Sequence, residues 1–201
     1  PPIPPPGLPT PAGPPGASDI AYIDTDASVS GDGSASILSV DLSTVTFTGN
    51  ISADRVFVVA STTAPATPAE VIVSGGLLST TNELSVGFDA TLEVTDAGTA
   101  DGPASAGASA QFDNYGLVTL TDTSRIDSNT LFDFGTLAIT SGLVDVGTME
   151  VASFDDPGGG PESGSLDIAG GGSLTDTLGI IGNSQTDDSA VTLTGGNWDN
   201  L

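Results

Sequence analysis

Carboxylates are the side chains of this chain that could do chemistry, because 26 acidic residues stand against two arginines, with no lysine, histidine or cysteine. Oxygen-rich turns can supply the six to eight ligands that calcium takes. We expect no cofactor, with calcium as the one candidate. The acidic residues that fall together in turn-like stretches are Asp24, Asp26, Asp155, Asp156, Glu162, Asp187 and Asp188. The leading interpretation of the acidic residues as a whole is a solvated coat, and adaptation to salty water and divalent-cation binding are the alternatives.

The paired aspartates could in principle flank a glycosidic bond as acid and nucleophile. Adjacent residues of a strand point to opposite faces, however, and both pairs lie in loop-like stretches rich in glycine, serine and proline. A lyase would use a basic residue to remove a proton, and Arg55 and Arg125 are isolated in the sequence. A serine nucleophile would need a base, and histidine is absent. We therefore predict that the protein is not an enzyme, and a polysaccharide-degrading enzyme is the third hypothesis.

Charge and hydropathy exclude two classes of partner. The formal net charge is −24. Nucleic acid is bound by neutralising phosphates with lysine and arginine, so this composition predicts no nucleic-acid binding. No apolar run approaches the ~20 residues that a membrane-spanning helix needs, which predicts no membrane insertion. With no cysteine, disulfides cannot hold the fold together.

A short phrase of alternating apolar and small polar residues, closed by glycine, recurs along the chain. Copies begin near residues 70, 91, 136, 165 and 190. The alternation has the period of a β-strand, and one short strand cannot bury its apolar side alone. Copies stacked in register share one core, which predicts an all-β fold of the parallel β-helix type, a β-solenoid. A β-sandwich is the alternative, because short alternating strands fit it too.

The spacing of the copies predicts where the chain carries insertions between its strands. The anchors Val71, Leu92, Val118, Leu137, Leu166 and Val191 are 21, 26, 19, 29 and 25 residues apart. A constant strand core with variable spacing indicates insertions at one corner, of which residues 100–110 and 155–164 are the longest. The register of the segments near 100–134 stays open. Ladders of stacked asparagine amides are expected at the corners, from Asn114, Asn129, Asn183 and Asn200.

The chain divides by composition into an arm and a body. Residues 1–18 are dominated by proline, which fixes φ and removes a donor, so an extended arm is expected there. Residues 19–201 are expected to form the solenoid. Within it, residues 19–68 are the first rungs or a cap, and residues 69–201 are the repeats.

The last repeat resembles a known tandem unit. Residues 164–174 read GSLDIAGGGSL, residues 179–184 read GIIGNS, and residues 191–200 read VTLTGGNWDN. This pattern is similar to the repeat of bacterial autotransporter passengers and PEP-CTERM-associated surface proteins, over residues 18–201 and most closely over 164–200. The resemblance implies an extracellular parallel β-helix at the cell surface, used as a stalk, adhesin or surface-layer element. It implies no catalytic residues.

A solenoid has two open ends whose unpaired backbone groups attract another strand, so we expect either that the natural protein continues or that a neighbouring subunit supplies the next rung. The expected function is therefore a non-enzymatic extracellular structural protein that stacks head-to-tail into a homopolymer, as a surface fibre or matrix. The residues expected at the contact are Pro1, Ile3, Leu8, Trp198 and Leu201. The second hypothesis is an adhesin whose loops bind glycans or another cell, with Trp198 as a candidate sugar platform.

Overall fold

The computed structural model describes residues 16–60, 68–104, 110–151, 164–182 and 189–200. The N-terminal proline-rich segment up to residue 15 lies outside this part. The described residues form strands and their connections, without a helix, in two sheets. The larger sheet contains β1 (Ile20–Ile23), β3 (Gly33–Asp41), β5 (Asn50–Val59), β7 (Leu77–Val86), β9 (Thr99–Asp101), β10 (Gln111–Asn114), β12 (Arg125–Asp133), β14 (Leu143–Val151), β16 (Ser173–Asp176), β17 (Leu178–Ile181) and β19 (Asn197–Asn200). The smaller sheet contains β2 (Ala27–Val29), β4 (Thr44–Phe47), β6 (Ala69–Ser74), β8 (Ala90–Thr95), β11 (Leu117–Leu120), β13 (Thr136–Ile139), β15 (Ser165–Ala169) and β18 (Ala190–Thr194).

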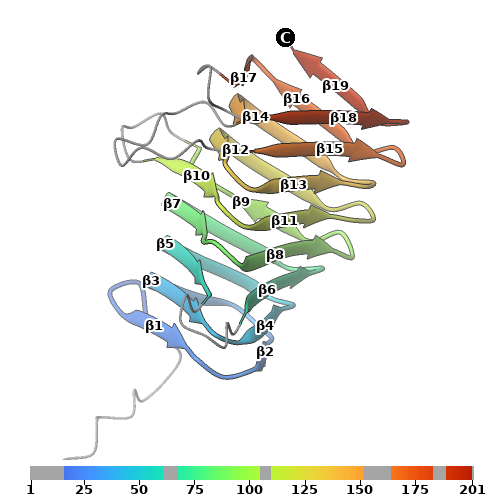
Figure 1. The fold of residues 1–201 in the computed structure, drawn as a ribbon. Coiled ribbons are helices and arrows are strands. Elements are labelled where there is room, and N and C mark those ends of the chain that lie inside the picture. The colour runs from blue at the N-terminus through green and yellow to red at the C-terminus, as the bar shows by residue number, and fades with distance from the viewer. Residues whose placement is uncertain (1–15, 61–67, 105–109, 152–163, 183–188, 201) are drawn as a thin grey trace, which may run out of the picture.

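The chain passes from one sheet to the other and back, so strands that neighbour each other in a sheet are not consecutive in sequence. The strands stack from β1 and β2 at one end to β18 and β19 at the other (Figure 1). Every pairing between the named strands is parallel, as in β6 with β8 and β12 with β14. The antiparallel sandwich that the sequence left open does not fit these pairings.

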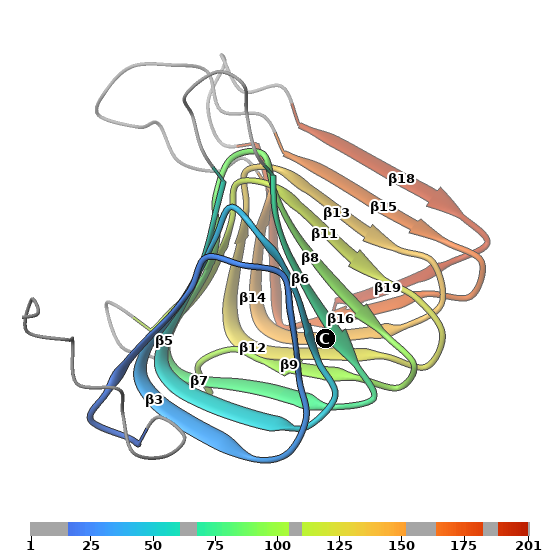
Figure 2. The ribbon, with the colours of Figure 1, turned by 90° about the horizontal axis from the view of Figure 1, so that it is seen from below.

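The long strands of the larger sheet bend and take part in two rows. The first row joins the early parts of the long strands to β9, β16 and β19. The second row joins their late parts to β1, β10 and β17. Together with the smaller sheet these rows give each coil three sides, which Figure 2 shows as a three-sided outline seen along the stack. We use the word coil for one passage of the chain through the second row, the smaller sheet and the first row.

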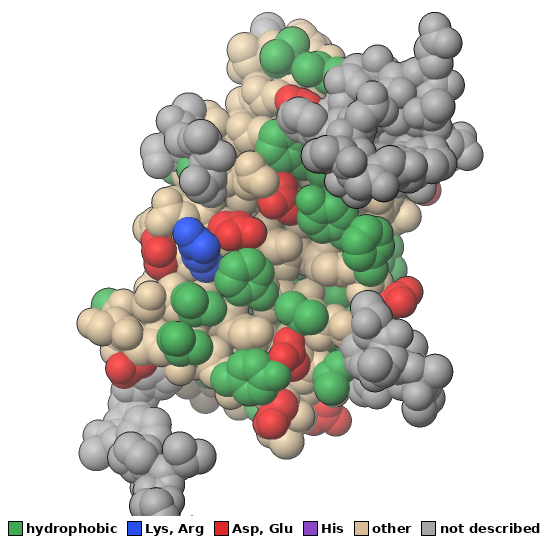
Figure 3. Space-filling view, turned by 60° about the vertical axis from the view of Figure 1, so that its left-hand side comes forward, with side chains coloured by type: hydrophobic (Ala, Val, Ile, Leu, Met, Phe, Trp, Pro, Cys, Tyr) green, Lys and Arg blue, Asp and Glu red, His purple; other side chains and the backbone are tan. Residues whose placement is uncertain are grey.

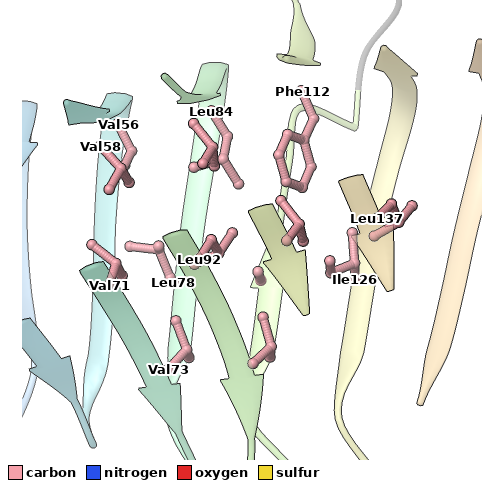
Figure 4. Close-up of a cluster of buried hydrophobic side chains, with 14 of the residues drawn as sticks. Val56, Val58, Val71, Val73, Leu78, Leu84, Leu92, Phe112, Ile126 and Leu137 are labelled. Carbon is pink, nitrogen blue, oxygen red and sulfur yellow. The ribbon is translucent and has the colours of Figure 1, made fainter. Parts of the chain in front are cut away.

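The core is a set of columns, each filled by the inward residues of successive strands. In the smaller sheet, the anchors Val71, Leu92, Val118 and Leu137 are in-register neighbours and are at most 1 % exposed. The column continues to Leu166 and Val191. The register predicted for the repeat is therefore confirmed at every anchor. Figure 4 shows Val71 and Leu92 pointing toward side chains such as Val56 and Leu84 of the larger sheet.

Glycine at the corners lets the coils approach closely. A Cβ built on Gly135 would lie 2.1 Å from the carbonyl oxygen of Gly116, one coil earlier. That distance leaves no room for a side chain, so the corner requires glycine whatever its φ angle.

The two long insertions expected at one corner lie at different places, which corrects the prediction. The segment between β9 and β10 connects the two rows of the larger sheet, whereas the segment between β14 and β15 connects the larger sheet to the smaller one. Ala100, expected to begin the first insertion, is a fully buried residue of β9. Spacing along the chain measures the length added per coil, and it does not say on which side the addition falls.

Candidate functional site

The last described coil leaves apolar side chains uncovered. Leu193 of β18 is 53 % exposed, although Ile168 and Ile139, the preceding members of its column, are at most 1 % exposed. Within the described residues, β18 forms a parallel ladder with β15 alone. Ile181 of β17, in register with the fully buried Val151, is also about half exposed, at 45 %. At this end, core-facing apolar side chains therefore lack a further coil that would cover them within the described residues.

Trp198 closes the core column of the first row. It is in register with Leu174 of β16 and packs, partly buried, against the core. Its indole Nε1–H donates a hydrogen bond of 3.1 Å to Oδ1 of Asp176, whose side chain is buried. The other oxygen, Oδ2, has no hydrogen-bond partner among the described residues. The ring is thus fixed at the end of the stack by packing and by one buried acceptor.

The first described coil is the counterpart at the other end. Ala21 and Ile23, the inward residues of β1, are partly buried against the core, and the outward Tyr22 donates a hydrogen bond from its hydroxyl to Asp41 of the next coil. On β2, Ala27 and Val29 are partly buried and rest on the core from one side. In the first row the column begins at Gly33, whose nearest neighbour at the Cβ position is Cδ1 of Ile51 at 3.4 Å. A small residue therefore starts the column that Trp198 ends.

The calcium candidates do not come together in the described part of the chain. The Asp26 carboxylate accepts a 2.8 Å hydrogen bond from the backbone N–H of Thr44, which fixes a corner of the following coil. The described residues contain no group of three or more acidic, histidine or cysteine residues that could hold a metal ion, and Asp24 therefore belongs to no such group. Five candidates lie outside the described residues: Asp155, Asp156, Glu162, Asp187 and Asp188.

The residues expected at the contact between copies and in the asparagine ladders also lie partly inside and partly outside the described part of the chain. Pro1, Ile3, Leu8 and Leu201 lie outside the described residues, whereas Trp198 lies at the end of the stack. Asn183 is outside as well. Asn114 does not stack on another asparagine, because its in-register neighbours are Val86 and Asp133. The amide ladder expected at this corner is therefore absent, and an amide–carboxyl pair takes its place.

One acidic row follows a shallow hollow of about 460 Å³ on the first row. Asp101, Asp127 and Asp145 are in-register neighbours on β9, β12 and β14. The guanidinium of Arg125 donates to the carboxylates of Asp127, at 2.5 Å, and Asp145, at 2.9 Å. The pKa of Asp101 is raised, chiefly by burial and then by the nearby Asp127, with Arg125 acting in the opposite direction. The arginine thereby offsets the repulsion that stacking three carboxylates creates.

Elsewhere the charge is dispersed. Arg55, the other basic residue, lies 4.0 Å from a carboxylate oxygen of Glu83. On the face drawn in Figure 3 the acidic side chains lie scattered between uncharged and apolar ones, without one continuous acidic patch. This distribution is what a solvated acidic coat would show on this face.

An aromatic ladder runs along the corner between the second row and the smaller sheet. The ring centroids of Phe88 and Tyr115 are 5.3 Å apart, and those of Tyr115 and Phe134 are 5.1 Å apart. Tyr115 and Phe134 are nearly parallel, at 19°, so each turns one ring face toward the other. Phe88, the first ring of the ladder, is 66 % exposed. The ladder was not predicted, although an aromatic residue beside glycine in each of three successive coils was a signal for it.

A polar pair is buried in the core of the second row. Asn114 donates from Nδ2 to Oδ1 of Asp133 at 2.7 Å and to the carbonyl oxygen of Thr136 at 3.0 Å. The backbone N–H of Gly135 donates to the same Asp133 oxygen at 3.3 Å. Burial raises the pKa of Asp133 to about 7, with the two hydrogen bonds opposing that rise. Near neutral pH this carboxyl is therefore partly protonated.

Comparison with known proteins supplies no relative. The chain matches no protein-family model, and the searches of curated proteins and of solved structures gave no match. None of the described residues belongs to a helix that is long and apolar enough to cross a membrane. The function must therefore be inferred from the geometry of the chain itself, and the two uncovered end coils are the surfaces that this geometry singles out.

Proposed function

We propose that the protein is a β-solenoid and that it works as a non-enzymatic structural subunit outside the cell, polymerising end to end into a surface fibre or matrix. The observation that carries the proposal is the change in exposure along one core column. Ile139 and Ile168 are at most 1 % exposed, and Leu193, the next member, is 53 % exposed. A further coil would bury Leu193 as each coil buries the one before it, and a second copy of the chain can supply that coil.

Hydrogen bonding supports the same proposal. Each edge strand, such as β18 or β2, has a strand on one side only within the described residues. The other side presents backbone N–H and C=O groups, which are templates for another strand. Burying the exposed part of a leucine would add about 1 kcal/mol to each contact. Several such contacts with new ladder hydrogen bonds favour association, against the entropy of joining two molecules.

The surface chemistry supports a structural role over a catalytic one. Both arginines lie beside carboxylates, and the hollow beside Asp101 is open and lined by polar and apolar residues alike. An acidic coat keeps strand-rich molecules from associating sideways, which leaves the ends as the preferred contacts. The extracellular location follows from the resemblance to bacterial surface repeats and is part of the proposal.

The test is the state of association of the 201-residue chain. We expect sedimentation velocity and negative-stain electron microscopy to show polymers that lengthen with protein concentration at constant width. Leu193→Asp should shorten them, because it places a charge at the uncovered end. Leu117→Asp adds the same charge at an exposed site on the side of the stack and should leave the polymers unchanged. A monomer at every concentration, or equal effects of both variants, would refute end-to-end polymerisation.

Glycan binding is the second candidate, and the exposed ring of Phe88 favours it. The ring borders a hollow of about 450 Å³ that is also lined by Asp89, Tyr115 and Phe134. Aromatic faces beside polar groups are suited to stacking on sugar rings. Retention on a glycan array that Phe88→Ala abolishes would support an adhesin. Retention that is absent, or unchanged in the variant, would count against it.

A further inference from the structure

We infer that copies join in one defined register, with β1 of one copy on β17 of the next, β2 on β18 and the start of β3 on β19. This inference rests on the proposed end-to-end polymerisation and specifies its contact. The joined coils would continue the path of the chain with no rotation between copies beyond the ordinary twist of the stack.

The described strands make up a whole number of coils. The smaller sheet has eight strands. The larger sheet has eleven, and five of them, β3, β5, β7, β12 and β14, take part in both rows, which gives eight strand segments in each row. The path starts in the second row with β1 and ends in the first row with β19. The edge strands at the two ends therefore follow the same three sides in the same order.

The side chains at the two ends also fit when the internal register is extended. Leu193 would lie on Val29, the first member of its own column, which is partly buried against the core. Trp198, the largest side chain at one end, would lie on Gly33, which has none. At Gly33 the nearest atom to a Cβ is the tip of Ile51 at 3.4 Å, on the side of its own copy. An indole opposite a glycine gives a contact in which volumes complement each other.

Electrostatics favours the same register. Among the strands that would pair at the junction, β19 carries an acidic residue, Asp199, and a shift of two residues along the strand would set it opposite Asp32. In the inferred register Asp199 faces Ser34, and Asp32, the residue before β3, faces Asn197. Thr192 faces Ser28, both uncharged and exposed. No acidic residue of one strand lies opposite an acidic residue of its partner, so the register avoids the repulsion between Asp199 and Asp32 that the shifted pairing would create.

Disulfide trapping tests the register, because the chain contains no cysteine. In the double variant Ser28→Cys with Thr192→Cys, the two cysteines of neighbouring copies would be opposite each other, about 5 Å apart between Cα atoms, within disulfide reach. Oxidation should give a ladder of covalent oligomers on non-reducing gels. In the control pair, Ser28→Cys with Thr194→Cys, the second cysteine lies two residues along the strand and should give several-fold less.

The outcomes separate this inference from the proposed function. Polymers that form in solution but cross-link equally through both pairs, or through neither, would refute the register and leave polymerisation standing. A chain that stays monomeric would refute both.

A second variant tests the contact between Trp198 and Gly33 without cysteines. Gly33→Leu would occupy the space meant for the indole, and a Cβ at this position would have only ordinary contacts within its own copy. Overpacking by about 1–3 kcal/mol corresponds to a rise of roughly 5- to 150-fold in the critical concentration for polymerisation. An unchanged critical concentration, with the fold intact by circular dichroism, would overturn the register.

Discussion

Asp133 shows how a single buried carboxyl can make the stability of a stack depend on pH. Its side chain is fully buried, and Oδ1 accepts from Asn114 and from the Gly135 backbone, whereas Oδ2 has no partner among the described residues. Burial without a second donor disfavours the charged form, which is why its pKa rises to about 7 from an ordinary value of 3.8.

The sign of the pH effect follows from these two pKa values. Between about pH 4 and 7 the folded state holds a proton on Asp133 that the unfolded state has lost, so the free energy of unfolding falls as pH rises through this range. The stabilising contribution is complete below about pH 4 and is lost above about pH 7. Three pKa units correspond to about 4 kcal/mol as an upper bound.

Asp133→Asn should therefore stabilise the protein at pH 8 and flatten the dependence on pH. The amide keeps an acceptor for Asn114 and Gly135 and carries no charge. Urea unfolding of both proteins at pH 5 and pH 8 measures the difference. Asp167→Asn on the solvated face of β15 removes the same charge and is the control for general repulsion. If the two variants gained equal stability at pH 8, burial of Asp133 would not be the cause.

The sequence was a better guide to where a residue lies in the fold than to which residue it contacts. Trp198 was expected at the contact between copies, and it packs against the core at the end of the stack. Asn114 was expected to stack on other asparagines, and it pairs with Asp133 instead. Asn114 and Asp133 have similar sequence surroundings, since each is followed by an aromatic residue and a glycine. Only the stacking of the coils brings Asn114 Nδ2 to 2.7 Å from Asp133 Oδ1.

Strands and their register are the scale at which the sequence was most informative. The apolar anchors confirm this, because Leu92, Val118 and Leu137 are in-register partners despite unequal spacing. Alternation in a strand identifies the inward side locally, and burial in one shared column then fixes the register. The bend that divides β12 or β14 between two rows was not predicted, although two consecutive residues that are not buried, Asn129 and Thr130 in β12 and Gly147 and Thr148 in β14, interrupt the alternation there.

Corner geometry gives a prediction at this scale. Gly135→Ala should destabilise the fold by about 1–3 kcal/mol, because its Cβ would meet the Gly116 carbonyl oxygen at 2.1 Å and force the two coils apart. Gly33→Ala, whose Cβ would have ordinary contacts, should be near neutral. Thermal unfolding of the two variants measures the difference. Equal melting temperatures would show that the corner can open without cost.

The whole molecule carries a net charge of −24, and this charge opposes any contact between copies. Raising the salt concentration from 0.1 to 1 M shortens the Debye length from about 10 to about 3 Å. We therefore expect salt to lower the critical concentration for polymerisation, which light scattering measures. Polymers that dissolve as salt increases would indicate that ion pairs, and not apolar columns, hold the copies together.

The eight-coil path gives a dimension that can be measured. Parallel strands lie about 4.8 Å apart, so each copy would advance the polymer by roughly 38 Å. Fibre diffraction should show both spacings along the fibre axis. An axial repeat that is not a multiple of the strand spacing would mean that the junction between copies interrupts the stack.

The mismatch in size between Trp198 and Gly33 has a consequence for how such a fibre grows. Its two tips are chemically different, one bearing an indole and a leucine, the other a bare glycine position and a valine. Growth is then directional, because each tip can bind only the opposite end of an incoming copy. An anchor or terminator shaped for one tip would leave the opposite tip free to elongate, and fibre length could be set from a single end.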